Sequence, residues 1–72
     1  MYRYWLKLRP AMPGAIPKKG LENIVNYDAR TYEPSIGQSV WGYVEYSEQL
    51  SKEDMYFFDL VKGRDEEEKG SL

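Results

Sequence analysis

The chain has 72 residues and a formal net charge of −2, and it contains neither cysteine nor histidine. Their absence excludes disulfides and thiolate metal ligands, and it removes the side chain that most often serves as a general base. A chain this short forms one domain at most, with a marginal core, so the two Trp, seven Tyr and two Phe must supply much of the buried apolar area.

The sequence shows no sign of membrane insertion or export. It has no apolar run long enough for a transmembrane helix, and the basic start lacks the apolar region of a signal peptide. These features favour a cytoplasmic protein. Charge is unevenly spread, because residues 1–19 carry five basic side chains and no acid, whereas residues 20–62 carry eight acids and three basic side chains. Such asymmetry bears on partners rather than on fold.

The first predicted element is a strand over residues 2–9, which Pro10 ends. Its residues alternate, with Tyr2, Tyr4, Leu6 and Leu8 on one face and Arg3, Trp5, Lys7 and Arg9 on the other. Residues 10–20 are rich in Pro and Gly and are predicted to be a loop. Residues 21–33 fit neither a helix nor a strand cleanly, and we expect a short hairpin or an extended arm there, followed by a turn over 34–37.

Residues 38–47 give the clearest strand. Val40, Gly42, Val44 and Tyr46 share one face, and Trp41, Tyr43 and Glu45 share the other. Because both faces carry large side chains, we expect this strand to be central and covered in part on both sides. A glycine among bulky neighbours indicates a close backbone approach or a bulge at Gly42.

The last elements are a helical turn over 51–57 and a strand over 57–62. Ser51 and Asp54 have the spacing of a capping box, and Leu50 and Met55 occupy the two flanking apolar positions. The charged residues 63–72 are predicted to be a disordered acidic tail. The fold class is therefore α+β: a small three- to four-stranded sheet with one short helix, formed by a single domain over residues 1–62. Its expected core includes Leu6, Leu8, Val40, Val44 and Phe58.

Three segments resemble a known family. YWLKLRP, IGQSVWGYVEY and LSKEDMYFFDLV occur in the same order and at similar spacing in small uncharacterised proteins from phage-like and integrative conjugative elements of Firmicutes and related gut bacteria. The resemblance covers residues 2–62 and leaves the tail outside. It implies a mobile-element context and supplies no catalytic residues.

A hypothetical binding face comprises Arg3, Trp5, Lys7, Arg9, Trp41 and Tyr43. An aromatic ring among cations is typical of a platform for single-stranded nucleic acid, where bases stack and phosphates pair. The competing structural interpretation packs Trp5 on Trp41 or Tyr43 and pairs Lys7 or Arg9 with Glu45. We favour the structural interpretation, because the acidic remainder of the chain opposes phosphate binding.

The carboxylates give no sign of catalysis. A paired-carboxylate site needs a cleft that so short a chain has little room to enclose, and no motif positions a base. We therefore expect no enzyme, no catalytic residues, no cofactor and no metal. The favoured function is a non-enzymatic protein-interaction module that serves a mobile genetic element, with another protein or a second copy as partner. The alternative is a weak single-stranded nucleic-acid-binding accessory factor; no small-molecule substrate is indicated.

Overall fold

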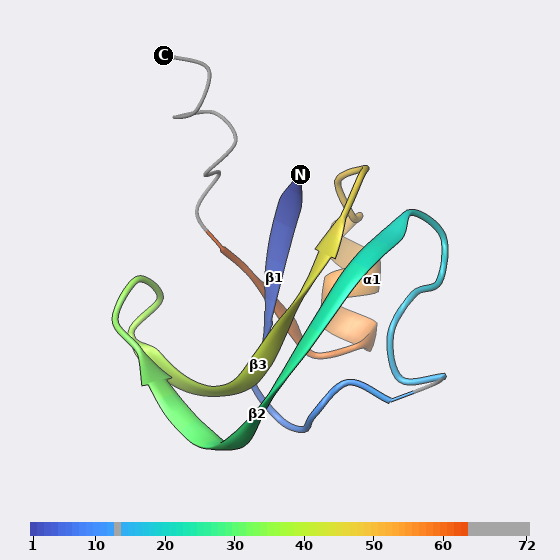
Figure 1. Cartoon of the computed structure of the whole chain (residues 1–72). Helices are drawn as coiled ribbons and strands as arrows, with labels where there is room; N and C mark the ends of the chain where they lie inside the picture. The colour runs from blue at the N-terminus through green and yellow to red at the C-terminus, as the bar shows by residue number, and fades with distance from the viewer. Residues whose placement is uncertain (13, 64–72) are drawn as a thin grey trace.

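A computed structural model describes residues 1–12 and 14–63 of the chain. Its elements are β1 (Tyr2–Leu6), β2 (Leu21–Glu33), β3 (Gln38–Tyr46), α1 (Lys52–Phe57) and β4 (Leu60–Lys62). The strands form one antiparallel sheet in the order β2-β3-β1-β4 (Figure 1). The α+β class is confirmed, with four strands. The predicted tail, apart from Gly63, lies outside the described residues, and no helix within them is long and apolar enough to cross a membrane.

β1 ends three residues earlier than predicted. Its last pairing with β4 sets Leu6 opposite Leu60, and the chain then leaves the sheet toward Pro10. Leu8 is consequently 54% exposed, so its predicted place in the core is wrong. Alternation continues in the sequence up to Arg9, but a strand persists only where a neighbouring strand supplies hydrogen-bond partners.

β2 is one continuous strand, so the hairpin predicted within residues 21–33 is wrong and the extended alternative holds. The register shifts between Leu21, opposite Tyr46, and Asn23, opposite Glu45. Glu22 is thus the extra residue of a bulge. This places Leu21 and Ile24 on one face, the face of their partners Tyr46 and Val44. The bulge explains why the sequence of this segment fits no single period.

β3 is central, as predicted, and its residues Val40, Val44 and Tyr46 are fully buried. Gly42 has a φ of 139°, and a Cβ atom built there would collide with the carbonyl oxygen of Val25 in β2. The close approach and the bulge expected at this glycine are both present, since the β2–β3 register shifts between Asn26 and Thr31. Both strands bend in this region (Figure 1).

The core lies on one face of the sheet, beneath the loop over residues 7–20 and the segment around α1. The buried cluster consists of Tyr4, Leu6, Ala11, Ile16, Val44, Tyr46 and Leu60. Burial of Leu6, Val40 and Val44 is confirmed, whereas Phe58 is only partly buried against this cluster. Two tyrosine hydroxyls fasten the covering segments: Tyr4 accepts a hydrogen bond from the Leu50 amide at 2.8 Å, and Tyr46 donates one to the Pro17 carbonyl at 2.7 Å.

Tyr46 should make the fold sensitive to alkali. Burial, with smaller contributions from Asp54 and Tyr4, raises the pKa of Tyr46 from 10.0 to about 12. Folding therefore favours the neutral phenol, so this stabilisation is complete below pH 10 and is lost as the pH rises toward about 12. Urea unfolding measured across this pH range should show a falling free energy of unfolding for the wild-type protein. The fall should be smaller for Tyr46→Phe. An equal fall in both proteins would show that Tyr46 is not the source.

Ser51 caps α1 as predicted. Its backbone is extended, and its Oγ accepts a hydrogen bond from the Asp54 amide at 3.1 Å. At the other end Asp59, with a φ of 58°, takes the left-handed conformation that often terminates helices. We expect Ser51→Ala to lower the free energy of unfolding by about 1 kcal/mol, while Ser51→Asp retains the cap. Ser51→Gly should fall between them, and a Gly variant much less stable than the Ala variant would contradict the capping role.

Candidate interaction surface

The predicted basic and aromatic face is divided in the structure. Arg3, Trp5 and Tyr43 do lie together, on the sheet face opposite the core. The Trp5 ring meets the Tyr43 ring edge-to-face with centroids 5.3 Å apart, and the Arg3 guanidinium lies 4.0 Å from the Tyr43 centroid. Arg3 also lies over Trp5, at 5.7 Å. The structural interpretation of these rings, with an arginine laid across them, is therefore confirmed for Trp5 and Tyr43.

Arg3 is the cation that pairs with Glu45, in place of Lys7 or Arg9. Its Nε and Nη2 atoms donate to the same Glu45 oxygen, Oε2, at 3.0 and 2.8 Å, and Asn23 donates to Oε1 at 3.2 Å. Burial alone would raise the pKa of Glu45, but the hydrogen bonds from Arg3 and Asn23 lower it below its usual value. The charge of Arg3 is thus balanced by Glu45, in an ion pair between β1 and β3.

Trp5 cannot serve as a stacking platform, because it is only 5% exposed. A base needs an open ring face, so this burial argues against the alternative of an exposed platform at Trp5. Trp41 is also separated from the others, since it packs against the core cluster that contains Val44 and Tyr46. Gly42, with its positive φ, interrupts the strand between Trp41 and Tyr43, and the two-residue alternation assumed for this strand does not carry across it.

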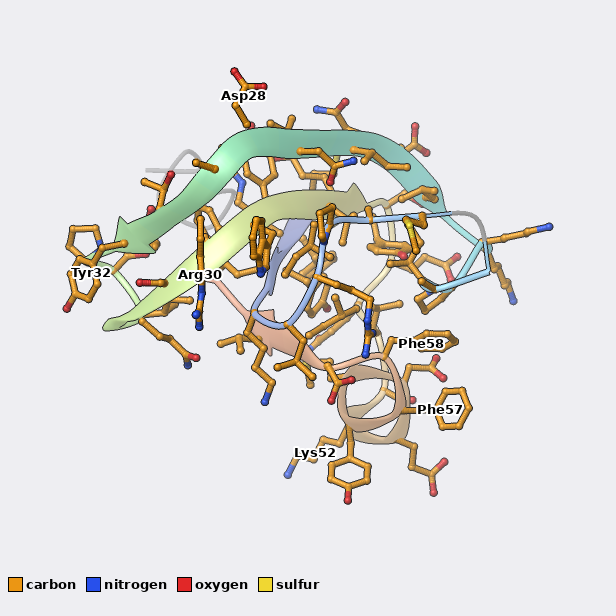
Figure 2. All side chains as sticks on the ribbon, turned by 90° about the horizontal axis from the view of Figure 1, so that it is seen from below. Asp28, Arg30, Tyr32, Lys52, Phe57 and Phe58 are labelled. Atoms are coloured by element: carbon orange, nitrogen blue, oxygen red, sulfur yellow. The ribbon has the colours of Figure 1, made fainter. Side chains whose placement is uncertain are left out.

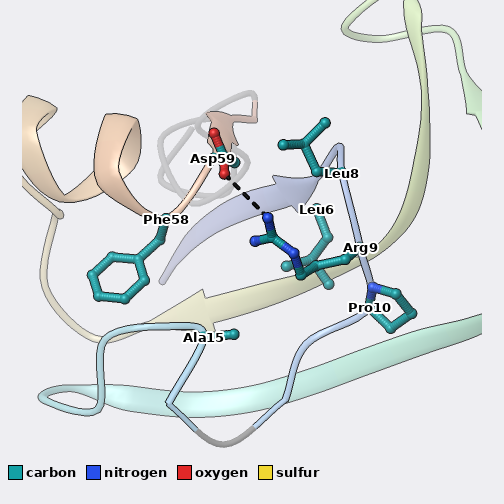
Figure 3. A pocket seen from close by; sticks show the side chains of 7 residues that line it. All are labelled: Leu6, Leu8, Arg9, Pro10, Ala15, Phe58 and Asp59. Carbon is teal, nitrogen blue, oxygen red and sulfur yellow. Dashed lines mark ion pairs between the residues drawn. The ribbon is translucent and has the colours of Figure 1, made fainter.

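Lys7 and Arg9 follow the end of β1, and Arg9 joins a different surface. Its Nη2 atom lies 3.6 Å from Oδ2 of Asp59, two residues beyond the end of α1. Leu8 and Phe58 line the same shallow depression as this ion pair (Figure 3). Phe58 in turn meets Phe57 edge-to-face, with centroids 4.9 Å apart. We define the aromatic patch as Leu8, Phe57 and Phe58 around the Arg9–Asp59 pair.

The aromatic patch exposes large apolar side chains to solvent. Phe57 is 76% exposed, and its neighbour Tyr56 is 87% exposed. Figure 2 shows the Phe57 ring projecting away from α1, with the Phe58 ring beside it. Met55 and Phe58 are three positions apart and both pack against the core cluster, so Tyr56 and Phe57 must face outward.

The sequence prediction missed this patch because the β-propensity of Phe57 and Phe58 favoured a strand from residue 57 onward. The signal that could have found it was present. The Ser51 cap fixes where the helix begins, and Leu50 and Met55 fix which side of it faces the core.

The model of the Defence against restriction A C-terminal family matches residues 1–65. The chain belongs to the Defence against restriction A C-terminal family. The match spans all four strands, α1 and therefore the aromatic patch. This small family is associated with phages and mobile elements, which confirms the general context implied by the resemblance. No curated protein and no solved structure matches the chain.

This member of the Defence against restriction A C-terminal family presents no metal-binding cluster among residues 1–12 and 14–63, where no three His, Cys, Asp or Glu side chains converge. Two of its carboxylates form ion pairs in the described structure: Glu45 pairs with Arg3, and Asp59 pairs with Arg9. The aromatic patch combines exposed apolar side chains with one exposed ion pair.

Proposed function

We propose that this chain is a non-enzymatic protein-interaction module, an accessory protein of a mobile genetic element that acts in defence against restriction. The aromatic patch is its contact surface, and the partner is another protein. The observation that carries the proposal is Phe57, a ring held 76% exposed by a capped helix and in edge-to-face contact with Phe58. Burying such rings at an interface removes apolar area from water, and aromatic and arginine side chains dominate binding at many protein interfaces.

The chemistry of the patch favours a protein over nucleic acid. Its one cation, Arg9, is paired with Asp59, and α1 carries Glu53 and Asp54 in its first turn. Phosphate binding requires cations that gain from releasing the counterions of the nucleic acid, and the acids of this surface oppose that gain. The depression between Leu8 and Phe58 is shallow and encloses no cavity, which disfavours a small-molecule ligand.

The family supports the proposed process, and the resemblance supports the proposed host. The family description names defence against restriction, and the shared segments point to mobile elements of Firmicutes and related gut bacteria. Within this proposal residues 1–62 act as one domain. Of the six residues predicted for a binding face, Arg9 is the one that belongs to the proposed contact surface.

A phage-plating assay tests the process. A restricting host that expresses the chain should plate unmodified phage more efficiently than the same host without it. Phe57→Ser should remove this protection, because a hydroxymethyl group cannot fill the place of a ring in the partner. Tyr32→Ser is the matched control: Tyr32 is 61% exposed but lies at the far end of the β2–β3 hairpin (Figure 2).

Binding is measured separately, by affinity capture from cells that carry the host element. Both variants should melt like the wild-type protein, since neither ring is in the core. Capture of a protein by the wild type and by Tyr32→Ser, with loss in Phe57→Ser, would support the patch. Full protection by Phe57→Ser would show that the patch is not the contact surface, and a lack of protection by the wild type would overturn the restriction role.

A further inference from the structure

The outer side of β2 is an open sheet edge. β2 pairs with β3 alone, and within residues 1–12 and 14–63 no other strand lies beside it. It has 13 residues, whereas β4 at the opposite edge has three. Proteins usually shorten, twist or charge such edges, because unpaired N–H and C=O groups attract another strand. A long open edge that lacks this protection can serve for binding by strand addition.

Only the first half of β2 lacks protection. After Asn26 the register shifts, the strand bends, and the exposed side chains of Asp28 and Arg30 follow (Figure 2). Bulges and charges of this kind discourage strand pairing. Before that point, residues 23–26 keep regular register with β3, and the one charge on the segment is Glu22. The usable edge is therefore Asn23–Asn26, because Glu22 is a charged bulge residue and the Leu21 N–H already donates to the Lys18 carbonyl.

An apolar groove runs beside this half of the strand. It has a volume of about 320 Å³, and it is lined by Ala11, Met12, Gly14, Ile16, Lys18, Leu21, Ile24 and Asn26. The bulge at Glu22 turns both Leu21 and Ile24 toward it, and the buried side chains of Ala11 and Ile16 border it. An added strand would project every second side chain to this face, so it would set one of them over the groove.

The groove is present before any ligand binds, and one charged residue lines it. The Asn26 side-chain amide accepts from the Ala11 N–H at 2.9 Å and donates to the Ala11 carbonyl at 3.2 Å, which fastens the loop to β2. Among the residues that the structure describes, Lys18 is the one charged residue of the lining. Among the described residues it forms no ion pair. A carboxylate on the ligand would complement it.

We propose that the edge of Asn23–Asn26, together with this groove, binds an extended segment of a partner protein by strand addition. An apolar side chain of that segment fills the groove, and an acidic side chain next to it pairs with Lys18. A second copy of β2 is the other candidate occupant, and the titration below distinguishes it from a partner segment. This site is separate from the aromatic patch and does not rest on the proposed function.

The probe is a capped peptide that alternates Thr and Val, with Asp beside one Leu, titrated into the isotope-labelled chain. Amide shifts should appear at residues 21–26 and around Ala11 and Met12. A peptide N-methylated at the pairing positions should give none, because it cannot donate backbone hydrogen bonds. Ile24→Lys should abolish the shifts, whereas Phe57→Ser should leave them unchanged, so failure here is distinguishable from failure of the aromatic patch.

A charge swap tests the role of Lys18. Lys18→Glu should weaken binding about two- to fivefold, the range of an exposed ion pair, and a peptide with Lys in place of Asp should recover it. Absence of shifts at millimolar peptide would overturn the proposal, as would shifts confined to the aromatic patch. Shifts at residues 21–26 that depend on protein concentration without peptide would show a second copy as occupant and would equally overturn it.

Discussion

Gly42→Ala is expected to unfold a large fraction of the protein. The φ of 139° at this position is strained for any residue with a side chain, and the new methyl group would meet the Val25 carbonyl and lie 3.0 Å from the Cα atom of Asn26. Both obstacles are backbone, so relief requires β2 and β3 to move apart. Backbone strain and overpacking each cost about 1–3 kcal/mol, which gives a loss of about 2–5 kcal/mol in the free energy of unfolding.

Gly37→Ala is the control for the conformational part of this effect. Gly37 has a φ of 70°, but nothing lies within 4 Å of the Cβ position there. Its substitution should cost about 1–2 kcal/mol, the strain of a left-handed residue alone. Urea unfolding of both variants separates the cost of the positive φ from the cost of the contact with the β2 backbone. Equal losses would mean that the close approach of β2 to Gly42 contributes nothing.

Leu6→Ala is expected to have the second large effect. Leu6 is 3% exposed, and it ends β1 opposite Leu60 within the main buried cluster. Truncation removes buried methyl groups and leaves a cavity, at a cost of about 2–5 kcal/mol. For a domain of this size that is a large part of the total stability, so the thermal midpoint should fall steeply or the transition should be lost.

Leu8→Ala provides the matched comparison, because the same substitution is made two positions later in the same sequence pattern. Leu8 is outside β1 and mostly exposed, so its truncation should change the free energy of unfolding by less than about 0.5 kcal/mol. Similar melting curves for Leu6→Ala and Leu8→Ala would contradict a strand β1 that ends at Leu6 and leaves Leu8 outside the sheet.

The parts of the fold that the sequence predicts are those with local causes. The cap at Ser51 needs only residues within one helical turn, and the glycine at position 42 stands out against its bulky neighbours. β1 is different, because its end depends on where β4 stops pairing, and no pattern within YRYWLKLR records that. The bulge at Glu22 likewise arises from pairing with β3, so the faces of β2 could not be assigned from periodicity alone.

The candidate surface shows the same division. The residue types around Trp5 suit both an exposed nucleic-acid platform and internal packing of the ring. Which of the two forms depends on the contact of Arg3 with Glu45 on the neighbouring strand. The aromatic patch brings together residues near Leu8 and near Phe57, which are far apart in the sequence. The bend of the chain after β1 brings Leu8 to the depression that Phe58 also lines, and the helix phase set by Ser51 places Phe57 against Phe58. No local sequence motif marks either feature.

The strand order also has a consequence for the order of folding. β1 is the first strand of the chain, but its two neighbours, β3 and β4, come from the second half, and its pairing of Leu6 with Leu60 spans most of the sequence. The β2–β3 hairpin can form from local contacts, whereas β1 must wait for both neighbours, and closing such long loops slows folding. Of these four strands, the one synthesised first is therefore among the last whose pairing can be completed.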